Sequence, residues 1–294
     1  MKAALDKGFD IPVYKTIRTR KKNCYPWPNI LSVKIIGDLT LEKAKEKILA
    51  DDSYSEPLSI TNSFGVPSYD PSFWQTDVKK AVSYVKKGQI LGLSFEGTRW
   101  EGFNEDDYIN DWVLGAKLSK ETGVHFLEAN LSCPNEGTKD LLCFDSNNVQ
   151  KIAYAVKNEI GNFPLVLKIS YFLDDYRLKD FIKKVGGIID SIAAINTISA
   201  EIINKNGDQA LPREGRLRSG VCGNAIRWVG LDMVRRIKNM RDEMRFKFKI
   251  IGVGGVASAK DFKIYINNGA DAVMSATGAM WNPHLAKEIK NIIK

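Results

Sequence analysis

The chain has 294 residues, and its 43 Lys and Arg against 35 Asp and Glu give a formal net charge of +8. Hydrophobic residues make up 44% of it, which is typical of a globular protein with a full core. No apolar run approaches the ~18 residues that a membrane-spanning helix needs, and the N-terminus lacks the pattern of a signal peptide. We therefore expect a cytoplasmic protein with no membrane partner. The basic residues are scattered along the chain, so we expect no nucleic-acid partner either.

The chain contains four cysteines and two histidines. No two cysteines have the C-x-x-C spacing that is typical of zinc, iron–sulfur and redox sites, and two histidines are too few for a multi-histidine centre. We therefore expect reduced thiols and no metal site. Catalysis, if present, must depend on other groups.

Short apolar runs alternate with amphipathic segments along the chain, and this pattern predicts β/α units around a parallel sheet. Helical spacing is clear in the apolar series that begins with Val149, Ile152 and Val156. The pair Ser258 and Asp261 indicates the start of another helix. Strands are expected at residues 13–17, 89–95, 125–131, 164–170, 191–198, 249–253 and 271–276.

No linker, repeat or low-complexity stretch divides the chain, so we expect one domain over residues 1–294. Residues 18–58 contain a Pro-rich loop and read as an insertion on the rim of the fold, with a short helix near residues 41–49. In β/α barrels the chemistry lies at the carboxyl ends of the strands. Polar residues at those ends are therefore the candidates for a functional site.

The segment from Glu128 to Asn135 displays a thiol, two carboxamides and a hydroxyl at the end of one strand. Asn130 closes the strand, and Cys133 precedes Pro134, which breaks it. Polar groups displayed together at a strand end are candidates for a functional site. The alternative makes Cys133 a small buried apolar residue and Asn130 a turn former, and the motif alone leaves both open.

Two lysines interrupt apolar strands at positions that would point into a barrel. Lys15 lies within residues 13–17, and Lys168 lies within residues 164–170. The alternative is an outward side chain that reaches water, but two inward lysines favour an anionic or electron-rich ligand. Asn62 and Asn196 add carboxamides at further strand ends, although each alone is equally consistent with a turn cap.

Glycine-rich turns follow the last two predicted strands. Gly254 and Gly255 end the first of them, and Ala276, Thr277 and Gly278 follow the second. Backbone N–H groups in paired turns of this kind form phosphate sites in β/α barrels. The two turns together therefore predict a phosphorylated cofactor, although any tight turn favours glycine.

Six motifs occur together in one order: Asn-Ser-Phe-Gly-Val-Pro67, Asn-Leu-Ser-Cys-Pro-Asn135, Lys168, Asn196-Thr197, Ser-Gly-Val-Cys-Gly223 and Gly-Val-Gly-Gly-Val256. This set resembles the dihydroorotate dehydrogenases, specifically the class 1-like enzymes with a cysteine base. The resemblance implies an α/β fold, an FMN-binding (β/α)8 TIM barrel. It also implies an oxidoreductase (flavoprotein) that converts (S)-dihydroorotate to orotate in de novo pyrimidine (UMP) biosynthesis.

The resemblance assigns roles to individual residues. Cys133 would be the general base, and Lys15 would lie between substrate and flavin as a second catalytic residue. The substrate would contact Asn62, Gly65, Val66, Asn130, Asn135, Asn196 and Thr197. FMN would contact Lys15, Asn130, Lys168, Gly220, Gly254, Gly255, Ala276 and Thr277. A homodimer that uses fumarate as electron acceptor is also implied.

The N-terminus has no strand that ends in an Ala-Ser-Gly-like turn, as the family would have there. We therefore expect the barrel to lack its first strand and most of its first helix. The alternatives are a dihydropyrimidine dehydrogenase-like or tRNA-dihydrouridine synthase-like flavoenzyme, or a truncated barrel homologue without activity. Yellow protein would favour an enzyme, and colourless protein that does not take up FMN would favour the inactive homologue.

Overall fold

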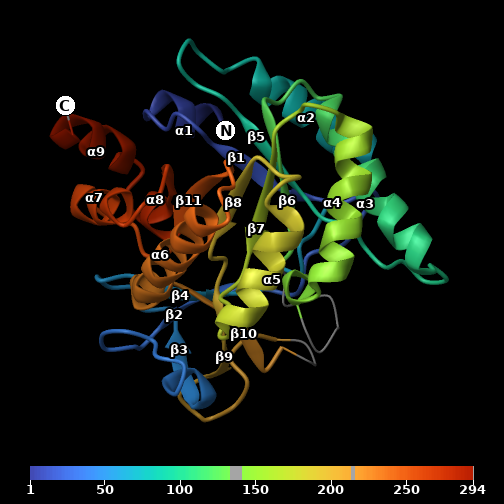
Figure 1. Cartoon of the computed structure of the whole chain (residues 1–294). Helices are drawn as coiled ribbons and strands as arrows, with labels where there is room; N and C mark the ends of the chain where they lie inside the picture. Colours follow the sequence, from blue (N-terminus) through green and yellow to red (C-terminus); the bar gives the residue numbers. More distant parts are fainter. Residues whose placement is uncertain (133–140, 213–215, 294) are drawn as a thin grey trace.

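The structure is a computed structural model, and it describes residues 1–132, 141–212 and 216–293. Its centre is a parallel sheet with helices packed against it (Figure 1). The strand order in the sheet is β1-β5-β6-β7-β8-β11-β12. The strands are β1 (Val13–Ile17), β5 (Gly92–Phe95), β6 (Phe126–Asn130), β7 (Leu165–Ile169), β8 (Ser191–Ala194), β11 (Lys249–Val253) and β12 (Ala272–Met274).

All seven predicted strands are present, most of them shorter than expected, and every neighbouring pair is parallel. The α/β class with a parallel sheet is therefore confirmed. In the described ranges β1 pairs only with β5, and β12 pairs only with β11. A complete (β/α)8 barrel and the absence of its first strand remain predictions, as does the division into one domain.

The helices cover the sheet through the apolar faces that the sequence predicts. The expected stripe of α4 is buried, from Val149 to Ile160, and so is that of α5. The Ser258 hydroxyl accepts a hydrogen bond from the Asp261 N–H at 3.2 Å, which confirms the predicted start of α7. The helices are α1 (Lys2–Asp6), α2 (Pro71–Val82), α3 (Glu105–Lys120), α4 (Ser146–Ile160), α5 (Asp175–Val185), α6 (Arg227–Glu243), α7 (Ala259–Asn267), α8 (Thr277–Trp281) and α9 (Leu285–Ile293).

Five more strands form a small closed barrel, in the order β10-β4-β2-β3-β9. Only three residues separate β8 from β9, so this barrel lies at the carboxyl ends of the parallel strands, below the sheet in Figure 1. The strands are β2 (Ile30–Val33), β3 (Lys47–Asp51), β4 (Ser59–Asn62), β9 (Ile198–Ile203) and β10 (Arg218–Gly223).

The helix expected near residues 41–49 is wrong. A 3-10 turn, η1 (Lys43–Lys45), leads directly into β3. Residues of β3 alternate between exposed and buried, with Ile48 and Ala50 inside, and this two-residue period is that of a strand. The other 3-10 turns are η2 (Leu142–Phe144) and η3 (Asn224–Ile226).

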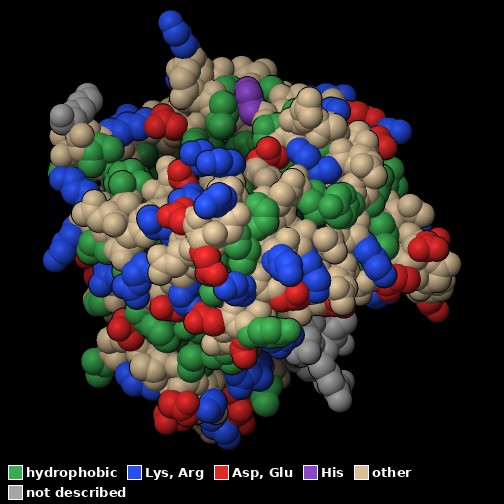
Figure 2. Space-filling model, viewed as in Figure 1, with side chains coloured by type: hydrophobic (Ala, Val, Ile, Leu, Met, Phe, Trp, Pro, Cys, Tyr) green, Lys and Arg blue, Asp and Glu red, His purple; other side chains and the backbone are tan. Residues whose placement is uncertain are grey.

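Acidic and basic side chains are interspersed on the face that Figure 2 shows. This mixture agrees with a net charge that is spread over the surface. Within the described ranges, no helix is both long and apolar enough to cross a membrane.

Candidate active site

Lys15 lies on β1, the first strand of the sheet. Its Nζ donates hydrogen bonds to the carbonyl of Thr16, at 3.1 Å, and to the carbonyl of Pro67. The residue is exposed overall, yet partial desolvation of the ammonium lowers the pKa of Lys15, and the positive charge of Arg18 lowers it further. Lys15 therefore ties the strand to the predicted substrate loop, residues 62–67.

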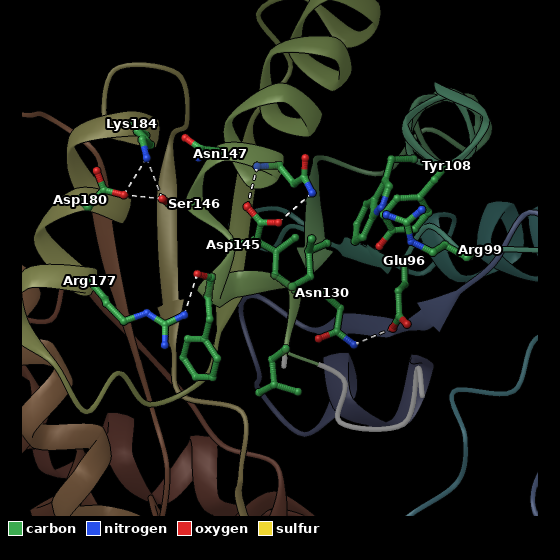
Figure 3. Close-up of a pocket in the computed structure, with 16 residues that line it drawn as sticks. Glu96, Arg99, Tyr108, Asn130, Asp145, Ser146, Asn147, Arg177, Asp180 and Lys184 are labelled. Atoms are coloured by element: carbon green, nitrogen blue, oxygen red, sulfur yellow. Dashed lines mark hydrogen bonds and ion pairs between the residues drawn. The ribbon is translucent and has the colours of Figure 1, made fainter. Parts of the chain in front are cut away.

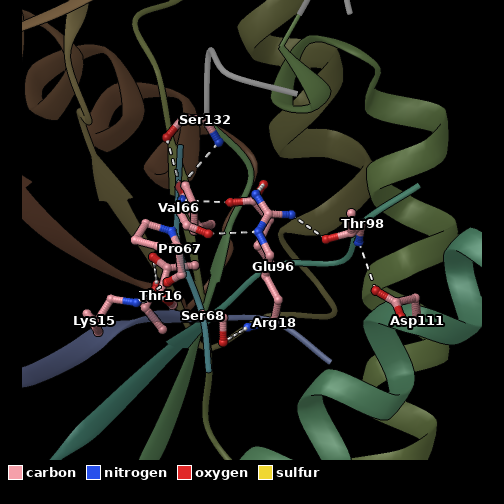
Figure 4. Close-up of polar contacts among 12 residues, drawn as sticks. Lys15, Thr16, Arg18, Val66, Pro67, Ser68, Glu96, Thr98, Asp111 and Ser132 are labelled. Carbon is pink, nitrogen blue, oxygen red and sulfur yellow. Dashed lines mark hydrogen bonds and ion pairs between the residues drawn. The ribbon is translucent and has the colours of Figure 1, made fainter. Parts of the chain in front are cut away.

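A buried ion pair lies directly after β1 and β5. The guanidinium of Arg18 contacts the Glu96 carboxylate at 2.9 Å, and the two side chains are 0% and 3% exposed. Arg18 also donates from Nε to the carbonyl of Val66, at 3.0 Å, and from Nη1 to the Thr98 hydroxyl (Figure 4). The Arg18 N–H donates to the Ser68 hydroxyl at 3.1 Å. The pair thus links two strand ends to the substrate loop.

Asn130 and Asn196 are joined through one serine. The Asn130 amide donates from Nδ2 to Glu96 Oε2 at 3.2 Å (Figure 3), and its Oδ1 accepts from the Ser132 hydroxyl at 3.3 Å. The Ser132 carbonyl accepts from Asn196 Nδ2 at 2.9 Å. Asn130 is paired in register with Lys168 on β7. Two of the predicted carboxamides and one predicted lysine therefore lie together at the carboxyl ends of the parallel strands.

A second group of predicted residues surrounds the thiol of Cys222 on β10. The Sγ accepts from Asn62 Nδ2 and from the Thr277 hydroxyl, each at 3.4 Å. Burial raises the pKa of Cys222, and these two hydrogen bonds and the charge of Lys168 oppose the shift without cancelling it. Cys222 is therefore a neutral thiol near neutral pH. Its sulfur joins Asn62, a predicted substrate contact, to Thr277, a predicted phosphate contact.

The substrate loop is fixed from its other side by Arg216 and Tyr25. Arg216 is 3% exposed; it donates to Asn29 Oδ1 at 3.0 Å and to the Ser63 carbonyl, and it lies 5.0 Å from the centre of the Tyr25 ring. That ring leaves no space at Gly65, where a Cβ would lie 2.5 Å from it and φ is +78°. Glycine is therefore required at this bend.

The predicted phosphate turns have backbone conformations that favour glycine. Gly254 and Gly255 have φ of +127° and +64°, and a Cβ at Gly255 would lie 2.7 Å from the Cβ of Arg227. The Tyr265 hydroxyl holds the turn by donating to the Gly254 carbonyl at 2.7 Å. Gly220 lies against Thr197, whose hydroxyl oxygen would be 2.5 Å from a Cβ at that position. Glycine is therefore required at 220 and 255, because other parts of the protein pack closely against both positions.

A cavity of about 560 Å³ opens beside the ends of β5 and β6 and extends between α3, α4 and α5 (Figure 3). Asn130 and Glu96 line it, together with Arg99, Arg177 and Lys184. Among its described lining residues, Asn130 is the one that the resemblance predicted as a site residue. The cavity therefore adjoins the predicted site through Asn130 and is otherwise separate from the glycine turns.

Cys133 and Asn135 lie outside the described residues, so their predicted roles remain predictions. Sequence reasoning did not select Arg18, Glu96 or Arg216 as site residues. The signal for Glu96 was available, because a carboxylate that directly follows an apolar strand is as unusual as the two strand lysines. Arg216 had no comparable signal, because most of its partners, among them Tyr25, Asn29 and Ser63, are remote in sequence.

Fold and site together define a parallel α/β protein with amide side chains at its strand ends and a glycine turn, which is the class of β/α proteins whose chemistry lies at the carboxyl ends of the strands. A family model described as dihydroorotate dehydrogenase matches residues 52–294. The chain therefore belongs to the dihydroorotate dehydrogenase family, whose members are oxidoreductases that act on CH–CH groups.

Individual relatives agree with this assignment. A dihydroorotate dehydrogenase from Dictyostelium discoideum is 33% identical over 99% of this chain and 80% of its own length. The catalytic subunit of dihydroorotate dehydrogenase B (NAD(+)) from Maridesulfovibrio salexigens is 31% identical over 81% of this chain and 74% of its own. The corresponding subunit from Thermodesulfovibrio yellowstonii is 30% identical over 90% of this chain and 82% of its own length.

Proposed function

We propose that this protein oxidises (S)-dihydroorotate to orotate with FMN as cofactor, a step of pyrimidine biosynthesis in the cytoplasm. The observation that carries the proposal is that Asn130, Asn196 and Lys168 lie together at the carboxyl ends of the parallel strands. Neutral amides suit the ring of a pyrimidine, which presents both donors and acceptors, and a lysine suits an electron-rich partner. The family and its relatives support the same reaction.

The residues present fit FMN. Gly220, Gly254, Gly255, Ala276 and Thr277 would hold its phosphate. When bound, FMN supplies the acceptor for the hydride that leaves the substrate. Lys168 would place a positive charge beside the ring, with Lys15 and Asn130 nearby. This arrangement is supported by the positive φ angles of Gly254 and Gly255, which turn the backbone as anion-binding loops require. It is also supported by the position of Lys168 beside Asn130.

The substrate would be held by amides and backbone, and its protons would be handled by Cys133. Asn62, Asn130, Asn135, Asn196 and Thr197 would bind the ring, beside Gly65 and Val66. The Cys133 thiolate would take the proton from C5 while the hydride leaves C6, so that the C5–C6 double bond of orotate forms. A thiol with a pKa near 8.5 is a workable base once its surroundings favour the thiolate.

Anaerobic addition of dihydroorotate to the yellow protein tests the proposal. We expect the flavin absorbance of the wild type to bleach within milliseconds to seconds in a stopped-flow instrument. Cys133→Ala should retain FMN and lose at least about 100-fold in the rate of bleaching, because a positioned base contributes about 10²–10⁴-fold.

Cys24→Ala is the matched control, because Cys24 is an exposed thiol. It should bleach at the wild-type rate. Unchanged bleaching in Cys133→Ala would refute the base assignment, and a wild-type protein that stays colourless after FMN addition would refute the flavoenzyme itself.

We also propose a homodimer that passes its electrons to fumarate. The alternative acceptor is NAD⁺, which two of the relatives carry in their names. In the same cuvette, fumarate should restore the bleached absorbance and NAD⁺ should not. Light scattering during gel filtration gives the mass of the assembly, and a mass near 32.9 kDa would contradict the dimer.

A further inference from the structure

The Arg18–Glu96 pair is unusual because both partners are almost completely buried. Their side chains are 0% and 3% exposed, and the two charged groups are 2.9 Å apart. Burial of two charges is favourable only when further hydrogen bonds satisfy both groups, and a pair of this kind is weak evidence for stability. Its position is more informative, since Arg18 and Glu96 follow β1 and β5 and point toward two parts of the proposed site.

Arg18 supports the backbone of the substrate loop. Its Nε donates to the Val66 carbonyl at 3.0 Å, and Val66 has a φ of +45°. A β-branched residue rarely adopts a positive φ, and the surrounding structure must hold it there. The planar guanidinium can bond Val66, Thr98 and Glu96 at once, which a lysine ammonium cannot reproduce with the same geometry.

Glu96 determines how the Asn130 amide is turned. An ionised carboxylate only accepts hydrogen bonds, so the amide nitrogen of Asn130 must face Glu96 Oε2, at 3.2 Å. Asn130 Oδ1 is thereby directed to the Ser132 hydroxyl, and the Ser132 carbonyl receives the Asn196 amide. One carboxylate therefore sets the orientation of a chain of two carboxamides.

We propose that Arg18 and Glu96 are positioning residues that orient the Asn130 amide and the Val66 carbonyl together and so set the affinity of the site for the pyrimidine ring. This inference rests on the proposed function. Neither residue needs to touch the ligand. They would affect affinity indirectly, because Arg18 bonds Val66 of the substrate loop and Glu96 bonds the Asn130 amide.

Glu96→Gln tests the role with little change in shape. A glutamine has an NH₂ donor in place of one of the two carboxylate oxygens. Because Arg18 only donates, the glutamine oxygen should face Arg18 and the NH₂ should face Asn130, so that the Asn130 amide turns over. We expect the Kd for orotate and the KM for dihydroorotate each to rise about 10-fold, because one hydrogen bond is lost at an oriented group. The Kd is measured from the flavin spectrum during a titration with orotate. The kcat should change less than 3-fold.

Asp111→Asn is the matched control. Asp111 is another buried carboxylate, and it accepts from the Thr98 N–H at 2.8 Å (Figure 4) and from the Thr19 hydroxyl at 2.5 Å. Among the described residues it contacts neither Asn130 nor Val66, and it is linked to Arg18 through Thr98. Its variant should lower the unfolding midpoint as Glu96→Gln does, with an orotate Kd within 2-fold of the wild type.

Arg18→Lys supplies a second measurement if Glu96→Gln does not fold, since it keeps the charge and loses the planar contact to Val66. It should also raise the orotate Kd. Unchanged orotate affinity in these variants, or an equal rise in Asp111→Asn, overturns the positioning role while the proposed function stands. A wild type that takes up FMN and orotate but does not bleach with dihydroorotate overturns the proposed function.

Discussion

Lys168 is a half-buried ammonium within an otherwise buried strand. The four other residues of β7 are buried, and the Lys168 ammonium has no hydrogen-bond or ion-pair partner among the described residues. Partial desolvation of an unpaired charge is unfavourable, and an anionic or electron-rich ligand beside Lys168 would compensate it. A flavin ring that becomes negative on reduction is such a ligand.

Lys168→Ala should therefore weaken the binding of FMN and make the bound flavin harder to reduce. We expect the Kd for FMN to rise at least about 10-fold, or the two-electron potential to fall by about 30 mV, which corresponds to a ten-fold change in equilibrium. Fluorescence titration and redox titration with a reference dye measure the two quantities. Lys151→Ala, which removes an exposed lysine of α4, is the control. Wild-type values of both quantities would contradict the role.

At this scale the strand lysines and carboxamides were predictable because an isolated polar residue in an apolar run is visible in the sequence. The partners that hold them were not. Arg216 reaches Asn29, which lies 187 positions away, and Ser63, which lies 153 positions away. Such contacts depend on how elements that are distant in sequence pack together, and a single sequence does not show which elements these are.

At the scale of elements, the parallel sheet was predictable and the small barrel was not. Each parallel strand is a buried run between amphipathic helices, a pattern that repeats along the chain. The strands of the small barrel are four to six residues long, and β4 pairs with β10, about 160 positions away. The segment near residues 41–49 was interpreted as a helix because neither of the strands that pair with β3, which are β2 and β9, was recognised from the sequence.

Asp271 fastens β12 to β11 at the edge of the parallel sheet. Its carboxylate accepts from the Ile250 N–H at 2.9 Å and contacts Arg241 at 3.0 Å and Lys249 at 3.1 Å. Burial alone would raise the pKa of Asp271, but the hydrogen bond from Ile250 and the two cations outweigh it, so the pKa lies below its ordinary value of 3.8. A lowered pKa in the folded state stabilises the protein above that value, and the contribution is lost as the pH falls below it.

Asp271→Asn should lower the free energy of unfolding by about 1–2 kcal/mol at pH 7, the usual effect of a lost charged hydrogen bond. The difference from the wild type should shrink as the pH falls below about 4, because the carboxyl takes up a proton first in the unfolded chain and then, at lower pH, in the folded protein. Urea unfolding at pH 7 and pH 3 measures both effects. Asp38→Asn, at an exposed carboxylate, should leave stability unchanged, and an equal difference at the two pH values would contradict the assignment.

At the scale of the whole molecule, α9 contacts the N-terminal segment, residues 8–10, which leads into β1. Leu285 and Ile289 of α9 form a cluster with Ala259, and Phe9 packs against it. Lys290 donates to the Gly8 carbonyl at 2.7 Å. The segment that leads into β1 is thereby joined to the helix that follows β12, so the two edges of the parallel sheet are connected by side chains of the terminal segments.

Leu285→Ala should therefore loosen the N-terminal segment as well as destabilise α9. Leu285 is 0% exposed, and loss of a buried leucine side chain costs about 2–5 kcal/mol. We expect a lower midpoint of urea unfolding and faster tryptic cleavage after Lys7, mapped by mass spectrometry. Ile292→Ala, at a position that is 60% exposed, should change stability by less than about 0.5 kcal/mol. If Leu285→Ala lowers stability while cleavage after Lys7 stays at the wild-type rate, the cluster stabilises α9 alone, and the connection between the two edges does not depend on it.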